Sequence, residues 1–478
     1  DIDRDRPNYT KKWCILAMVV VVLSGIAVGL SFSLTKRNKS SSDTAQDSPP
    51  AASPGPEDSS SSSTPQVEDP AQPGILFDQV GETIAGPSRI FEYGIGTNGK
   101  FGASLSLSGD GGRVAIGAPN YSASIFSKGE RLGLVQVFEQ LNGTWTKLEP
   151  DIFGDLSGDA TGTSVSLSSD GMTLAVGSPE HLNAIFGGQV ILYQFSDDGV
   201  WQQLGSPIIG DDAFDRLGTS VSLNDGGDRV AISQPTDKPG GAARKVAKVY
   251  ELQDNDWVQL GDDLVGRAGS DPVSMSGNGQ VVALGSLSRT ENNNRAAVRI
   301  YHYANNTSTN ETVGWELKGP EIELKGAKGS YDTLWMPSLS ADGNTVAIGS
   351  AIENFNKTEN PNEQHELQVL AYRYDEEFGN WTEIPVNTNL EMQGLHLLQY
   401  STSLSGDGQV LVVGDSGAGL VEVLHLTDKD GAYIPVEGNV ELKGVEGSDD
   451  LFGYSVAVSS DGKKLASGAP QSVVAGEE

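Results

Sequence analysis

The stretch Phe101 to Pro119, FGASLSLSGDGGRVAIGAP, decides the fold. Polar and apolar residues alternate in its first half, an Asp-Gly pair follows, and a second apolar run leads to Gly117-Ala118-Pro119. Alternation with period two on both sides of an Asp-Gly pair is typical of a β-hairpin. Near-copies recur along the chain, and their turn glycines are Gly111, Gly171, Gly226, Gly279, Gly343, Gly408 and Gly462.

Two further strand patterns repeat between these hairpins. One is a β-branched run such as Gln189 to Tyr193, QVILY. The other starts with an aromatic residue and ends with an aliphatic one, and its copies start at Phe77, Trp145, Trp201, Trp257, Trp315, Trp381 and Tyr433. A repeat of roughly 53 to 65 residues built from hairpins is typical of a β-propeller. The sequence therefore predicts an all-β fold over residues 76–478, a seven-bladed β-propeller of four-stranded antiparallel blades.

The order of the strands also predicts how the ring closes. The pattern opens with a lone aromatic strand, Phe77 to Val80, and ends with a lone hairpin, Tyr454 to Ala469. We expect these two pieces to share one blade, whose third strand would lie beyond Glu478. Because the chain also begins at Asp1 without a methionine, we expect a fragment at both ends, with the last blade truncated.

An apolar segment precedes the repeats. Trp13 to Leu34 carries no charged residue and is long enough to cross a bilayer, which takes about 20 residues. We predict a short cytoplasmic tail at 1–12 and a transmembrane signal-anchor helix at 13–35, giving a single-pass type II protein with the repeats extracellular or lumenal. The alternative is a signal peptide cleaved near Ala27-Val28-Gly29. Residues 36–75, rich in Ser and Pro, predict a disordered stalk because they have few apolar side chains to bury.

Charge limits the partners. The net charge of −32 argues against nucleic acid, whose phosphates require a basic surface. Cations, basic proteins or neutral glycans are compatible partners. The only cysteine, Cys14, excludes an intrachain disulfide. Sequons in predicted loops or turns give the glycosylation candidates Asn120, Asn142, Asn306, Asn310, Asn356 and Asn380.

The hairpin motif resembles the FG-GAP repeat of integrin α-chain propellers. Phe101-Gly102 is followed by Gly117-Ala118-Pro119, and Phe452-Gly453 by Gly468-Ala469-Pro470. A WD-repeat propeller is the competing resemblance. The integrin-like family implies calcium loops with several aspartates, but each Asp-Gly pair here offers one carboxylate, whereas calcium needs six to eight oxygens. We therefore expect no calcium at these turns and no metal site carried over from the family.

A second group of acids lies where one repeat leads into the next: Asp155, Asp159, Asp211, Asp212, Asp215, Asp449 and Asp450. Propeller geometry predicts that these loops share one face, where they could bind a cation or another ligand. Asp215 and Asp450 are the weak candidates for such a site. The alternative is structural, since each stands three residues before a glycine, which suits an Asx-type turn.

No catalytic or cofactor motif stands out. The five histidines are scattered without metal or triad spacing, and Gly94 to Gly99 matches a dinucleotide fingerprint without the helix that it requires. The tryptophans, one per repeat, indicate packing between blades rather than sugar binding. We expect no catalytic residue and no cofactor. The favoured function is a membrane-anchored cell-surface binding or adhesion protein with a protein or glycan ligand on the propeller face; a propeller hydrolase, glycosidase- or phospholipase-like, and a lectin or structural wall component are the alternatives.

Overall fold

The computed structural model describes residues 30–35 and most of 76–471. The gaps in that range are 81, 87–89, 92–93, 96–98, 123–130, 182–185, 236–245, 267–271, 291–292, 305–313, 325–329, 335, 355–364, 391–399, 429–430, 437–441 and 445–449. The predicted tail at 1–12 and stalk at 36–75 lie outside the described residues, as does most of the predicted anchor. In the part that the structure describes, no helix is long and apolar enough to cross a membrane.

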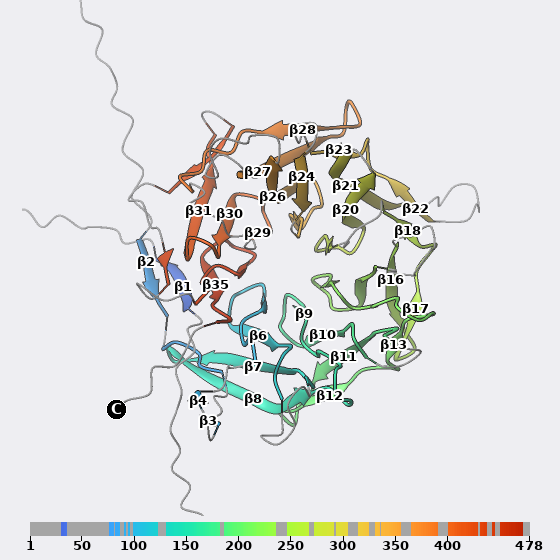
Figure 1. Cartoon of the computed structure of the whole chain (residues 1–478), viewed down its shortest axis with the longest axis vertical. Helices are drawn as coiled ribbons and strands as arrows, with labels where there is room; N and C mark the ends of the chain where they lie inside the picture. Colours follow the sequence, from blue (N-terminus) through green and yellow to red (C-terminus); the bar gives the residue numbers. More distant parts are fainter. Residues whose placement is uncertain are drawn as a thin grey trace, which may run out of the picture.

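The repeats form a β-propeller, a ring of antiparallel sheets around a central channel (Figure 1). The first repeat contributes β5 (Ser104–Leu107), β6 (Arg113–Ala118), β7 (Leu134–Leu141) and β8 (Thr144–Phe153). The second contributes β9 (Ser164–Leu167), β10 (Thr173–Ser178), β11 (Gln189–Phe195), β12 (Trp201–Gln203) and β13 (Ile208–Ile209). The third contributes β14 (Val221–Leu223), β15 (Arg229–Gln234), β16 (Val246–Gln253), β17 (Asp256–Gln259) and β18 (Leu264–Val265). A separate hairpin, β3 (Ile90–Phe91) and β4 (Gly94–Ile95), precedes them.

The fourth and fifth repeats share one ten-stranded sheet. The fourth contributes β19 (Val273–Met275), β20 (Val281–Thr290), β21 (Asn293–Ala304), β22 (Gly314–Leu317) and β23 (Ile322–Glu323). The fifth contributes β24 (Ser330–Leu334), β25 (Ser338–Leu339), β26 (Thr345–Asn354), β27 (His365–Asp375) and β28 (Asn380–Ile384). The sixth repeat forms β29 (Tyr400–Leu404), β30 (Val410–Asp415), β31 (Leu420–Leu426), β32 (Tyr433–Pro435) and β33 (Leu442–Lys443).

Counted as separate sheets, the ring has six blades, so the predicted seven is wrong. The reason lies in an extra strand, β24, which pairs with β26 and also touches β21 in parallel, at Asn294 and Tyr331. The long hairpins β20–β21 and β26–β27 bring these edges together, and the hydrogen bonding merges two neighbouring repeats. The repeat count in the sequence does not reveal such a merger, because β24 lies in a connection with no repeated motif.

The ring closes as predicted, with the first and last pieces in one sheet. Its strand order is β2 (Leu76–Gln79), β1 (Leu30–Thr35), β35 (Lys464–Gly468) and β34 (Ser455–Val458). The third position is occupied by β1, not by residues beyond Glu478, and residues 30–35 are therefore a strand where an anchor helix was predicted. Their sequence, LSFSLT, alternates with period two, which suits a strand lying beside β35.

Backbone hydrogen bonds join the seven inner hairpins around the channel. The N–H of one residue per hairpin donates to the carbonyl of its counterpart in the next hairpin, over 2.8 to 3.0 Å, and the last donates back to the first. We call these residues the central ring: Gly109, Ser169, Asp225, Gly277, Ala341, Gly406 and Ser460. This closed circuit shows how the fold closes without a disulfide.

A second set of bonds links the innermost strands through serine. The Ser166 hydroxyl, for example, accepts from the Leu223 N–H of the next repeat at 2.9 Å. The same role is taken by Ser106, Ser222, Ser274, Ser338 and Ser403. At the closing junction, between β34 and β5, the equivalent residue is Ala457, which has no hydroxyl. The junction that closes the ring therefore lacks one of the repeated bonds.

Replacing Ala457 with serine should strengthen this junction. A hydroxyl there can accept from the Leu107 N–H, and one such bond contributes about 0.5–1.5 kcal/mol to the free energy of unfolding. We expect Ala457→Ser to raise the urea midpoint, whereas Ser166→Ala should lower it because the Leu223 N–H loses its acceptor. If Ala457→Ser unfolds at a lower urea concentration than the wild type, the closing junction does not have the strand geometry of the other junctions between repeats.

The tryptophans pack between repeats, as predicted. The indole N–H of Trp257 donates to the Leu204 carbonyl of the preceding repeat at 2.9 Å. Trp145, Trp315 and Trp381 make the corresponding bonds to Val80, Leu260 and Lys318. Trp201 differs, because its indole nitrogen is buried and has no hydrogen-bond partner among the described residues.

This contrast gives a prediction. Trp257→Phe removes a hydrogen bond and leaves a carbonyl unpaired, whereas Trp201→Phe removes a buried donor that has no acceptor. We expect Trp257→Phe to lower the free energy of unfolding by about 1–2 kcal/mol more than Trp201→Phe. Urea unfolding followed by circular dichroism measures both, and equal losses would contradict the role given to the indole bond.

Candidate functional site

The acids between repeats lie at separate blade junctions. Asp159, Asp215 and Asp450 are buried, whereas Asp155, Asp211 and Asp212 are exposed. Asp449 lies outside the described residues. Among those described, no three His, Cys, Asp or Glu side chains form a group that could hold a metal ion.

Each buried aspartate binds nearby backbone. Asp159 accepts from the Leu156 N–H at 2.8 Å, and Asp215 accepts from the Asp212 N–H at 2.7 Å and the Gln234 amide at 2.8 Å. Asp450 accepts from the Phe452 N–H at 3.1 Å. The residue after each takes positive φ: Ala160, Arg216 and Leu451. These contacts favour the structural alternative for the candidates Asp215 and Asp450, since the carboxylates hold the loop that leads into the next repeat.

The structure also pairs a histidine that sequence reasoning passed over. His181 Nδ1 lies 2.9 Å from Asp159 Oδ1, although the two residues are far apart in the sequence. Beside them, Glu180 forms ion pairs with Arg131 at 2.8 Å and Arg216 at 3.2 Å. No spacing rule could have found this cluster, because it is assembled from loops of successive repeats.

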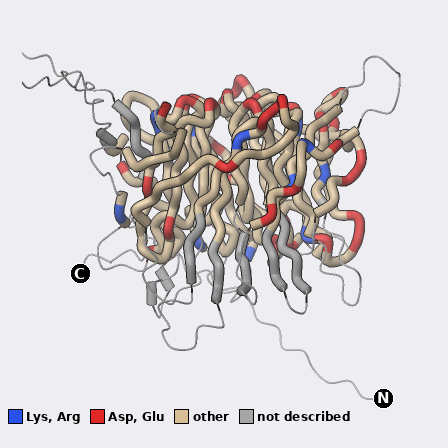
Figure 2. The backbone as a smooth tube through the Cα atoms, turned by 90° about the horizontal axis from the view of Figure 1, so that it is seen from above, with Lys and Arg blue, Asp and Glu red and all other residues tan. Residues whose placement is uncertain are grey.

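The opposite end of the ring, which we call the turn face, collects both kinds of hairpin turn. In an antiparallel blade, the turn between the first two strands and the turn between the last two lie at the same end. Figure 2 shows carboxylate-bearing residues gathered along one end of the ring. The exposed acids in these turns are Asp110, Asp170, Asp225, Asp228, Asp342, Asp407 and Asp461 in the inner turns and Asp197, Asp198, Asp254, Asp256, Glu376, Glu377 and Asp428 in the outer turns.

Most inner-turn aspartates are tied into their own turn. Asp170 Oδ1 accepts from the Ser168 hydroxyl at 2.6 Å and from the Met172 N–H at 2.9 Å. The same pair of bonds recurs at Asp110, Asp342, Asp407 and Asp461. At Asp110 and Asp461, burial opposes ionisation, but the hydrogen bonds outweigh it and lower the pKa. These Ser–Asp networks explain why the hairpin motif contains serine two residues before aspartate.

The third repeat breaks this pattern and places Asp225 in the channel. Its turn is closed by Asn224 and Asp228, which are bonded at 2.7 Å, and its residue with positive φ is Gly227 rather than the predicted Gly226. The sequence predicts that Asp225-Gly226 forms the turn, but the turn lies one residue later, at Gly226-Gly227. Asp225 therefore takes the ring position that glycine or serine holds in the preceding repeats. Asp225 is therefore the only charged residue of the central ring.

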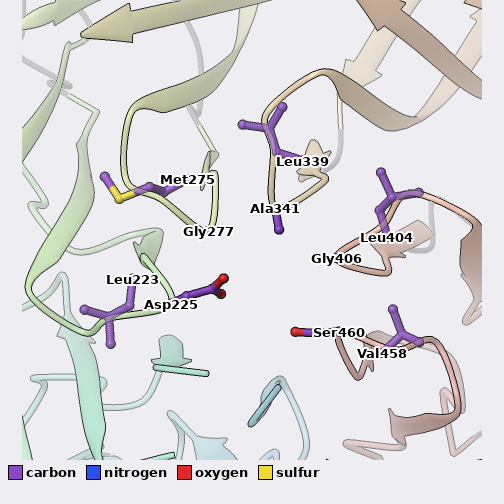
Figure 3. Close-up of a pocket in the computed structure, with 10 residues that line it drawn as sticks. All are labelled: Leu223, Asp225, Met275, Gly277, Leu339, Ala341, Leu404, Gly406, Val458 and Ser460. Carbon is purple, nitrogen blue, oxygen red and sulfur yellow. The ribbon is translucent and has the colours of Figure 1, made fainter. Parts of the chain in front are cut away.

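A cavity of about 130 Å³ lies at this mouth of the channel (Figure 3). Five successive hairpins line it, each with an apolar residue and a member of the central ring. The Asp225 carboxylate and the Ser460 hydroxyl point into it from opposite sides. Partial burial raises the pKa of Asp225, and no hydrogen bond or ion pair among the described residues reaches its carboxylate. This cavity is the candidate binding site that the sequence did not reveal.

Of the predicted glycosylation sites, Asn142 and Asn380 are exposed and Asn120 is half-buried in a turn. Asn306, Asn310 and Asn356 lie outside the described residues.

Known proteins resemble this chain in fold only. No protein-family model and no curated protein sequence matches it. Among solved structures, hydrazine synthase of Kuenenia stuttgartiensis is 12% identical, covers 76% of this chain and 91% of its own, and has a TM-score of 0.48. The periplasmic gluconolactonase of Pseudomonas aeruginosa is 14% identical over 77% of this chain and 93% of its own, with a TM-score of 0.45. At such identities no activity or site residue carries over to this chain.

Proposed function

We propose that this protein is a binding protein whose propeller takes a basic protein partner on its turn face. The observation that carries the proposal is the concentration of exposed carboxylates there, around a channel mouth with an unpaired aspartate. Several basic side chains near these turns already have partners. Arg113 and Arg229 pair with Glu139 and Glu251 and donate to the carbonyls of the neighbouring turns.

Such a face attracts cationic partners by long-range electrostatics. The apolar run that precedes β1, residues 13–29, supports a membrane anchor and display of the ring outside the cell, with the sequons glycosylated. Because β1 and β2 both belong to the closing sheet, residues 36–75 connect these two strands and are not the stalk that the sequence predicted. The FG-GAP resemblance supports a role in adhesion of the integrin-like kind. A protein ligand fits the charge better than a neutral glycan does.

The test is binding of a hexa-arginine peptide to the full chain in a neutral detergent, measured by calorimetry. We expect binding that weakens at least tenfold between about 0.05 and about 0.5 M salt, because exposed charges are screened at high salt. Asp197→Asn with Asp254→Asn, which removes two turn-face charges, should weaken it further.

The matched control is Asp155→Asn with Asp262→Asn, which removes two exposed charges away from the turn face. We expect this control to bind nearly as well as the wild type. If both double variants lose the same affinity for the peptide, net charge and not the turn face determines binding. If the wild type does not bind the peptide at low salt, the proposal of a basic partner is wrong.

A further inference from the structure

Three members of the central ring carry a polar side chain, and two of them, Asp225 and Ser460, line the cavity at the channel mouth. Ser169 and Asp225 are neighbours in the ring, and Ser460 follows on the other side of Gly109. The remaining members are glycine or alanine. Among the described residues, neither the Ser169 and Ser460 hydroxyls nor the Asp225 carboxylate has a hydrogen-bond partner, in contrast to the aspartates that are bound in Ser–Asp networks.

Glycines in the ring leave room for these groups. A Cβ on Gly277 would lie 2.2 Å from Asp225 Oδ2, so the carboxylate rests over the bare backbone of this glycine. A Cβ on Gly109 would lie 2.1 Å from the Ser169 hydroxyl and 3.1 Å from the Ser460 hydroxyl. Both hydroxyls therefore approach the same glycine, and the Ser460 hydroxyl and the Asp225 carboxylate are the side-chain acceptors that line the cavity.

We infer that the channel mouth is a binding site for a primary ammonium group, supplied by a lysine side chain of the partner. An ammonium offers three N–H donors, and the Asp225 carboxylate and the Ser460 hydroxyl supply three acceptor oxygens for them. The cavity of about 130 Å³ is far below the roughly 300–1,000 Å³ of sites for drug-sized ligands, but it suits the end of one side chain. A single carboxylate is too few for calcium. The inference rests on the proposed function only for the source of the ammonium.

Binding of hexa-lysine and hexa-arginine peptides to the full chain tests this specificity. We expect the wild type to prefer hexa-lysine, because the planar guanidinium does not match three acceptors around a small cavity. Asp225→Asn should weaken hexa-lysine binding about tenfold and remove the preference, since it loses a charged hydrogen bond. Gly277→Ala should also remove the preference although it leaves the charge unchanged, because the new Cβ displaces the carboxylate.

Asp342→Asn is the control, since it removes the same charge from the same face. Asn278 already holds the equivalent turn in the fourth repeat, with bonds of 2.8 and 2.9 Å, so the substitution preserves the turn. The control should keep the preference for lysine. If Asp225→Asn and Asp342→Asn behave alike, the channel site is wrong although a basic partner still binds the face.

A small probe separates this inference from the proposed function. Methylammonium should raise the Tm of the wild type in a saturable way, by about 1–2 °C, because a ligand that binds only the folded state stabilises it. Tetramethylammonium has no N–H donor and should not raise it at equal ionic strength. A methylammonium effect that is absent in Asp225→Asn supports the site even if neither peptide binds; no effect in the wild type overturns it.

Discussion

Gly177→Ala should destabilise the propeller by about 2–3 kcal/mol, which is large for the addition of one methyl group. A Cβ on Gly177 would lie 2.1 Å from the Gly218 carbonyl oxygen of the next repeat. Both groups are backbone, so the two repeats must separate before the methyl group fits. The same approach occurs at Gly117, Gly414 and Gly468, which face Gly162, Gly453 and Gly102.

The measurement is the free energy of unfolding in urea, with Gly314→Ala as the control. Gly314 lies in β22, and apart from the glycine itself and its two chain neighbours no atom of the described residues lies within 4 Å of its would-be Cβ. We expect the control to be neutral or slightly stabilising, since alanine costs less conformational entropy than glycine. If Gly177→Ala is equally mild, the contact between repeats is looser than the structure indicates.

Phe452→Ala should have the largest effect, a loss of about 3–5 kcal/mol in the free energy of unfolding. Phe452 is fully buried in a cluster with Val412, Val421 and Leu465, at the junction of the sixth repeat with the closing sheet. Removing the ring leaves a cavity where the chain closes. We expect a lower Tm and a closing sheet that opens before the others.

The control is Phe378→Ala, which truncates a phenylalanine that is 76% exposed in an outer turn. It should change the free energy of unfolding by no more than about 0.5 kcal/mol. Hydrogen exchange in the Phe452→Ala variant locates the region that opens first. If β34 and β35 are more protected than the other blades of this variant, the junction is not the weak point of the ring.

Local pattern predicted much of this fold, since a repeated hairpin has the same period whatever surrounds it. The propeller, the pairing of the first and last pieces and the packing role of the tryptophans all follow from residues within one repeat. The FG and GAP motifs can also be read from the sequence, but the sequence does not explain why glycine is needed in them. The glycine of one repeat faces the carbonyl of the glycine at the FG position of the next, whether or not a phenylalanine precedes it, and such a contact exists only in the closed ring.

The sequence by itself determined the all-β repeat, the excess of negative charge and the candidate aspartates at the blade junctions. Only the tertiary structure decided the six sheets, the strand formed by residues 30–35, the contact of His181 with Asp159 and the place of Asp225. The physical reason is that these features depend on which edges and turns of distant segments meet. Asp225 looked like one turn aspartate among six, and a shift of one residue in its turn moved its carboxylate from the rim into the channel.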